Sequence, residues 1–219
     1  MAGEGKCDAE KAPRVALIDY GSSNLGSVEK ALEQAGAKVV RCLTPEAMDS
    51  CDAVVLPGVG SFGDCARRMK ERGLTEALKE WLLADRPYLG ICLGYQILFE
   101  GSEESPDQAG LGHWSGQVVK FPRHTGLKVP HMGWNQLGWK KADQIFADLP
   151  DPAHLYFVHS YFPLPNDPRI VTATSNHGLE FAAAAGQGRV RGMQFHPEKS
   201  QKIGLQILKN FVKELKGKN

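Results

Sequence analysis

The run YLGICLGYQILFE, residues 88–100, changes its pattern at Cys92. Before the cysteine the residues are apolar and partly β-branched, which predicts a buried strand, whereas Leu93 begins a run with helical spacing. Cys92 therefore lies where a strand passes into a helix. Gly90 and Gly94 flank Cys92. Glycine suits these positions because side chains would crowd a sharp turn. An elbow of this kind exposes its central side chain at the carboxyl edge of a sheet.

The segments on either side of the elbow predict the fold class. RVALID, AKVVRC and DAVVLP read as strands, and helical patterns cover about residues 27–35 and 65–84, with a break at Gly73. After residue 101 short β-type runs dominate, and a helix at about 201–215 follows them. This order predicts an α/β fold: a flavodoxin-like, mainly parallel sheet flanked by helices, with antiparallel additions.

Composition sets limits on organisation and partners. The 219 residues are 42% hydrophobic, which suffices for one sizeable core, so we expect a flexible tail at 1–13 and a single domain at 14–219. The 26 basic and 25 acidic residues nearly cancel, which gives no sign of nucleic acid or a membrane surface as partner. Five cysteines without a CxxC pair favour a reduced, cytoplasmic setting. No apolar run reaches the roughly 18 residues of a membrane span.

Cys92 is a candidate nucleophile because a helix N-terminus favours the thiolate. Structural cysteines are common, so the elbow alone leaves the two interpretations balanced. Among seven histidines, His196 is the candidate base, since it follows a strand-like run in GMQFHPEKS. Glu198 is two residues on, and an extended segment held by Pro197 would let it accept a hydrogen bond from the His196 ring. Taken alone, this segment fits a turn with a solvated carboxylate better. Together with the Cys92 elbow, it favours a catalytic triad.

Backbone amides near Cys92 are candidates for binding an oxyanion. The amide of Leu93 directly follows the cysteine and begins the helix. In LPGVGSF, Gly58 and Gly60 would let further amides approach a ligand closely. A plain glycine turn is the alternative interpretation of that loop.

Five segments together resemble class I (triad-type) glutamine amidotransferases, in particular glutaminase subunits of histidine biosynthesis: LPGVGSFGD, LGICLGYQILFE, VPHMGWNQLGW, YFVHSYF and GMQFHPEKSQKIGLQILKNF. The resemblance covers about residues 15–212. It implies the fold of that class and a catalytic triad of Cys92, His196 and Glu198. It also implies an oxyanion hole at Gly58, Val59 and Leu93, and glutamine binding by Gly58, Gln96, His159, Ser160 and Tyr161.

The same resemblance implies a reaction and a partner. L-Glutamine would be hydrolysed to glutamate and ammonia through a thioester at Cys92, with no metal or organic cofactor. The ammonia would pass to a separate (β/α)8-barrel cyclase subunit, with which the chain would form a heterodimer. Four residues are expected to face this partner: Asn24, Trp134, Asn135 and Lys199. Of these, Trp134 and Asn135 are in HMGWNQLGW, which is expected to be a Gly-rich connecting loop.

Other functions are consistent with part of the sequence. A glutaminase that feeds pyridoxal phosphate synthesis, or a free-standing cysteine hydrolase, would share the elbow, but neither is expected to contain PHMGWN and HPEKS. A nucleotide- or phosphate-binding module could be argued from DYGSSNLG. That stretch has only Gly21 and Gly26, does not match G-x-G-x-x-G, and has no Walker lysine.

Overall fold

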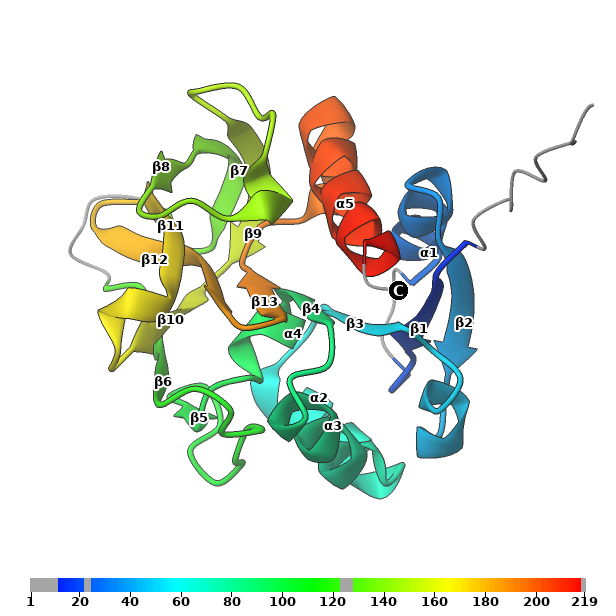
Figure 1. Ribbon diagram of the computed structural model, residues 1–219. Helices are drawn as coiled ribbons and strands as arrows, with labels where there is room; N and C mark the ends of the chain where they lie inside the picture. The colour runs from blue at the N-terminus through cyan, green and yellow to red at the C-terminus, as the bar shows by residue number, and fades with distance from the viewer. Residues whose placement is uncertain (1–11, 22–24, 123–127, 218–219) are drawn as a thin grey trace, which may run out of the picture.

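In the computed structural model, which describes residues 12–21, 25–122 and 128–217, eight strands form the central sheet (Figure 1). In sheet order they are β2 (Lys38–Cys42), β1 (Arg14–Ile18), β3 (Ala53–Gly58), β4 (Tyr88–Cys92), β13 (Val190–Met193), β12 (Glu180–Gln187), β11 (Val171–Asn176) and β8 (Gly138–Trp139). The first five are parallel and the last three are added antiparallel. The parallel part has the order 2-1-3-4-5 of flavodoxin-like sheets, which confirms the predicted fold class.

Helices cover both faces of the sheet. Helices α1 (Leu25–Gln34) and α5 (Gln201–Lys216) lie on one face, and α2 (Phe62–Glu71) and α3 (Leu74–Leu83) lie on the other (Figure 1). The predicted break between α2 and α3 is present at Gly73, whose φ is +70°. No helix in the described part of the chain has the length and apolar content needed to cross a bilayer.

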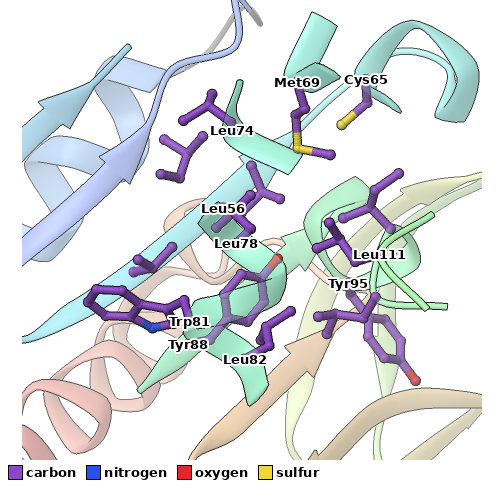
Figure 2. Close-up of a cluster of buried hydrophobic side chains, with 14 of the residues drawn as sticks. Leu56, Cys65, Met69, Leu74, Leu78, Trp81, Leu82, Tyr88, Tyr95 and Leu111 are labelled. Atoms are coloured by element: carbon purple, nitrogen blue, oxygen red, sulfur yellow. The ribbon is translucent and has the colours of Figure 1, made fainter. Parts of the chain in front are cut away.

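Two hydrophobic clusters form because side chains alternate along the parallel strands. In β3, Val54 and Leu56 enter the cluster under α2 and α3, whereas Val55 enters the cluster under α1 and α5. Figure 2 shows the first cluster, in which Trp81 and Tyr88 pack near Leu78 of α3. Each such side chain that is removed from water contributes about 1.5–3 kcal/mol of hydrophobic stabilisation. The buried strands thereby fix the edge at which β3 and β4 end.

Smaller sheets and short helices complete the molecule. A three-stranded sheet contains β10 (Tyr161–Pro165), β6 (Gly116–Lys120) and β5 (Gly101–Ser102). The strands β7 (His131–Gln136) and β9 (His154–His159) form a separate antiparallel pair, with His131 opposite His159. The 3-10 helices are η1 (Pro45–Met48), η3 (Gln144–Phe146), η4 (Pro168–Ile170) and η5 (Pro197–Lys199).

Two expectations about local structure were wrong. The segment that contains Trp134 and Trp139 is not a loop, because it forms β7 and β8. Pairing with β9 stabilises β7, although its buried end is a histidine and not an apolar residue. The helix after Cys92, α4 (Leu93–Gln96), is also shorter than its apolar run. The carbonyls of residues 97, 98 and 99 accept hydrogen bonds from the backbone amides of residues 111, 114 and 112, respectively. These carbonyls are therefore already bonded outside the helix that a longer α4 would form.

The predicted division into a tail at 1–13 and one domain at 14–219 stays a prediction, because residues 1–11 lie outside the described residues. The cytoplasmic setting also stays a prediction. Four cysteines lie in the described ranges and all are free thiols: Cys42, Cys51, Cys65 and Cys92.

Candidate active site

Cys92 stands at a strained elbow between β4 and α4. Its φ of 54° and ψ of −103° place it at positive φ, which side-chain-bearing residues rarely adopt. The flanking glycines make this geometry possible. A Cβ at Gly94 would lie 1.7 Å from the carbonyl oxygen of Leu56, and one at Gly90 would lie 2.3 Å from that of Gly94. The sharp turn therefore depends on two positions that accept no side chain.

His196 and Glu198 meet beside this elbow. The Nδ1 atom of His196 lies 2.8 Å from Oε1 of Glu198, and their side chains are 2% and 1% exposed. The backbone amide of His196 donates to the carbonyl of Tyr156 over 2.9 Å, and Ser200 Oγ donates to the His196 carbonyl over 2.6 Å. These bonds hold the backbone of His196 against β9 and Ser200.

The hydrogen bond between His196 and Glu198 was expected, but the reason given for it was wrong. The segment after His196 is not extended, because Pro197 begins the 3-10 helix η5. His196 itself is extended, with φ −103° and ψ 97°, and the turn after it carries Glu198 back to the ring. Proline suits the first position of such a turn because that position needs no N–H donor.

The electrostatics of His196 indicate an ion pair. Burial by itself lowers the pKa of His196, but the Cys92 sulfur and the Glu198 carboxylate act in the opposite direction and raise it to about 10. The other ring nitrogen, Nε2, is buried and has no hydrogen-bond partner among the described residues. The arrangement therefore favours the protonated form of the His196 ring.

A cavity of about 300 Å³ opens beside Cys92. Its lining contains most of the residues predicted for catalysis and substrate binding: Val59, Cys92, Leu93, Gln96, His159, Ser160 and Tyr161. Gly60, Glu104, Pro130 and Val158 complete the lining. Gly58 does not line the cavity. It pairs with Cys92 across the sheet, where a Cβ would lie 2.8 Å from Leu93 Cβ.

Amide donors are available on two sides of Cys92. Leu93 is the first residue of α4, and the first four amides of a helix have no acceptor within it. Val59 follows the end of β3, the strand next to β4 in the sheet. Gly60 then turns the chain at a φ of +109°. The described residues contain no group of three or more His, Cys, Asp or Glu side chains arranged to hold a metal ion.

A line of hydrogen bonds fixes one wall of the cavity. His159 Nδ1 donates to the Tyr161 carbonyl over 2.9 Å, so its Nε2 accepts from His131 Nδ1 at 3.0 Å. His131 Nε2 then accepts from Asn135 Nδ2 at 3.1 Å, and that amide group also donates to the Asn176 carbonyl. Burial lowers the pKa of His131 to about 4 and that of His159 to about 3. Both rings are therefore neutral at pH 7, as the directions of these bonds require.

Gln194 is a site residue that the sequence analysis missed. Its side chain is fully buried, and its Nε2 atom donates to Cys92 Sγ over 3.5 Å. Its Oε1 atom accepts from Gln96 Nε2 over 3.0 Å. The signal was present, because Gln194 is two residues before His196 and alternate residues of an extended segment face the same side.

The residues expected to face a partner lie in different environments. Trp134 is 48% exposed on β7, and its ring lies 6.1 Å from that of Tyr156 on β9. The ammonium of Lys199 lies 5.9 Å from the same Tyr156 ring. The Asn135 side chain bonds to His131 and so contributes to the cavity wall. Asn24 lies outside the described residues.

Comparison with known proteins places the chain in a family. The glutamine amidotransferase class-I family matches residues 16–215, so the chain belongs to this class of proteins. Imidazole glycerol phosphate synthase subunit HisH of Geobacter metallireducens is 45% identical over 203 residues, which is 90% of this chain and 97% of the relative. The HisH subunit of Thermosynechococcus vestitus is 47% identical over 203 residues, with 92% and 97% covered. Within its class the chain belongs to the family of these HisH subunits.

Solved structures agree with the fold. The structure of PurLQS from Thermotoga maritima matches with a TM-score of 0.74 and 19% identity, covering 94% of this chain and 100% of that chain. The crystal structure of a glutamine amidotransferase from the same organism matches with a TM-score of 0.64 and 16% identity, covering 95% of this chain and 100% of that chain. At this identity the likeness supports the α/β fold and no finer conclusion.

Proposed function

We propose that this chain is the glutaminase subunit of an imidazole glycerol phosphate synthase. It hydrolyses L-glutamine to glutamate and ammonia, and it delivers the ammonia to a (β/α)8-barrel cyclase subunit that forms imidazole glycerol phosphate in histidine biosynthesis. The observation that carries the proposal is the buried His196–Glu198 pair acting on Cys92 at the edge of a 300 Å³ cavity. The names of the HisH relatives support the choice of complex.

The first half of the reaction forms the thioester. The Cys92 thiolate attacks the side-chain amide carbon of glutamine, a C–S bond forms, and an electron pair moves onto the carbonyl oxygen. The amides of Leu93 and Val59 donate to this oxyanion, and Gly58 leaves room for the close approach of Leu93. The intermediate collapses as His196 Nε2 gives its proton to the departing nitrogen. The C–N bond breaks and ammonia leaves.

The second half restores the enzyme. His196 Nε2 takes a proton from water, whose oxygen attacks the thioester carbon. The C–S bond then breaks, Cys92 leaves as a thiolate, and glutamate departs. Glu198 accepts the hydrogen bond from Nδ1 throughout and so orients the ring. In each half Gln96 and the backbone of Ser160 and Tyr161 hold the amino-acid end of the substrate.

The partner contacts the face formed by β7, β9 and η5. Two large side chains of β7 are exposed there, Met132 at 63% and Trp134 at 48%. Tryptophan and methionine are both enriched at the centres of protein interfaces. Lys199 lies on the same face and directly follows Glu198, so a partner that moves this lysine acts one residue from the orienting carboxylate.

Substitution of Cys92 by alanine tests the function. With the cyclase and its ligand present, Cys92→Ala should abolish glutamate release, while synthesis supported by added ammonium continues because ammonia bypasses only this step. Cys65→Ala is the matched control, since burial raises the pKa of the Cys65 thiol to about 12 and keeps it inert. Glutamine hydrolysis by Cys92→Ala at the wild-type rate would exclude Cys92 as the nucleophile.

The glutaminase activity of the isolated chain, measured with and without the cyclase, distinguishes this proposal from a free-standing hydrolase. We expect glutamine turnover to rise strongly when the cyclase and its ligand are added. Full activity of the chain alone would favour the free-standing hydrolase.

A further inference from the structure

Gln194 connects the nucleophile to the substrate-binding glutamine. It follows strand β13, and its backbone amide donates to the Ala183 carbonyl over 2.8 Å. The side chain is 0% exposed and lies between two functional groups, with Cys92 Sγ at 3.5 Å from Nε2 and Gln96 Nε2 at 3.0 Å from Oε1. Methionine would fill a similar volume without a polar group to bury. The presence of an amide side chain at position 194 is therefore explained by its hydrogen bonds and not by the volume that it fills.

The neighbouring bonds fix which end of the Gln194 amide faces sulfur. Gln96 Nε2 uses its two hydrogens on the Tyr161 carbonyl, at 2.9 Å, and on Gln194 Oε1. The Tyr161 carbonyl can only accept, and His159 Nδ1 also donates to it. Gln96 must therefore present nitrogen to both partners. Gln194 consequently presents its oxygen to Gln96 and its NH₂ group to Cys92.

Because both hydrogens of Gln96 Nε2 are used in these bonds, the Oε1 atom of Gln96 stays available as an acceptor. Gln96 lines the cavity. An acceptor there suits the α-ammonium group of an amino-acid substrate. Gln194 thus touches the reacting sulfur and also sets the orientation of the group that holds the substrate. A neutral amide is suited to this position because it donates to a thiolate without competing with His196 for the proton.

We propose that Gln194 is a further catalytic residue of this site: it donates a hydrogen bond to the Cys92 thiolate and locks the Gln96 side chain. The proposal rests on the proposed glutaminase function for its kinetic part. Its two contacts act on different quantities. Loss of the bond to sulfur lowers kcat and the thiolate fraction, and loss of the bond to Gln96 raises KM for glutamine.

The test uses Gln194→Met in the complex with the cyclase subunit. Alkylation of Cys92 by iodoacetamide is followed across pH on the Cys92 peptide by mass spectrometry, and glutamine kinetics are measured in parallel. We expect the pH of half-maximal alkylation to rise by about one unit, which is a tenfold smaller thiolate fraction at a given pH. We expect kcat/KM to fall at least about tenfold, with changes in both kcat and KM.

Asn210→Leu is the matched control. Asn210 is also a buried amide, but it bonds to the carbonyls of Ile145 and Ala147 and not to the site. This variant should lose stability and keep both the alkylation profile and the kinetics of the wild type. If Gln194→Met does not fold, Gln194→Asn replaces it, because the shorter amide cannot span from Cys92 to Gln96.

An unchanged alkylation profile together with kcat/KM within about twofold of the wild type, in a folded Gln194 variant, overturns the proposal. The alkylation does not need glutamine turnover. A wild-type complex that fails to hydrolyse glutamine would therefore reject the proposed function, and the alkylation shift would still test the contact between Gln194 and sulfur.

Discussion

Replacing Glu198 by glutamine tests the two proposed roles, in which Glu198 orients the ring of His196 and His196 transfers the proton. The change keeps the shape of the side chain and an oxygen that can accept from Nδ1, but it removes the negative charge 2.8 Å from the ring. A hydrogen bond to a charged group contributes about 1.5–3 kcal/mol, and the pair here is almost fully buried. At 1.36 kcal/mol for each factor of ten, kcat/KM should fall by about 10- to 200-fold. His196→Ala removes the proton carrier itself and should cost more.

The same substitution has a pH signature. His196 has a folded-state pKa raised to about 10, above its ordinary value of 6.5. The stabilisation linked to its proton is therefore fully present below pH 6.5 and is lost as the pH rises through about 10. In Glu198→Gln one of the two charges that raise the pKa of His196 is gone, so this loss should be smaller and should be complete at lower pH. Nitrogen-15 NMR of the His196 ring in both proteins measures the shift directly.

Two results would refute this reasoning. Equal kcat/KM values for the wild type, Glu198→Gln and His196→Ala would exclude the triad. A larger loss for Glu198→Gln than for His196→Ala would show that the carboxylate does more than orient the ring.

Three further predictions address the elbow, the cavity wall and the partner face. Gly94→Ala should fail to give a stable, active protein, whereas Gly26→Ala, where an added Cβ meets nothing within 4 Å, should be tolerated; thermal unfolding compares them, and equal melting temperatures would contradict the elbow geometry. His159→Gln should flatten the loss of stability that the wild type shows as the pH falls from 6.5 toward 3, because the unfolded chain takes up a proton that buried His159 resists. An equal shift of the urea-unfolding curve between pH 7 and pH 5 in wild type and variant would argue against it. Trp134→Ala should weaken association with the cyclase, whereas Lys199→Ala should change ligand-stimulated turnover more than binding; calorimetry and turnover assays separate the two effects, and unchanged values in both variants would reject this face as the interface.

The elbow and the pair around His196 could be predicted from the sequence because they depend on neighbours in the chain. Gly90 and Gly94 lie within two residues of Cys92, and Glu198 lies within two residues of His196. Residues this close in the chain can contact each other in several local conformations. In this structure, the turn of η5, and not an extended segment, brings Glu198 to the His196 ring. The alternation of strands and helices likewise indicated the parallel sheet.

The features that were missed depend on pairing between distant segments. His131 reaches His159 only because β7 pairs with β9, and a strand that begins with a buried histidine does not show an apolar pattern. Gln194 meets Gln96 because β13 lies beside β4, although the two glutamines are far apart in the chain. The spacing of Gln194 from His196 is present in the sequence, but its contact with Gln96 becomes visible only when the register of the sheet is known.

Labelling with a diazoketone analogue of glutamine tests the central claim most directly. The analogue resembles the substrate and alkylates the nucleophile that attacks it. In the complex with the cyclase subunit, we predict one covalent label on Cys92, slowed by excess glutamine, with glutaminase activity lost and ammonium-supported synthesis retained. Complete loss of glutaminase activity with the label on another residue, or with Cys92 unmodified, would contradict the assignment of Cys92 as the nucleophile.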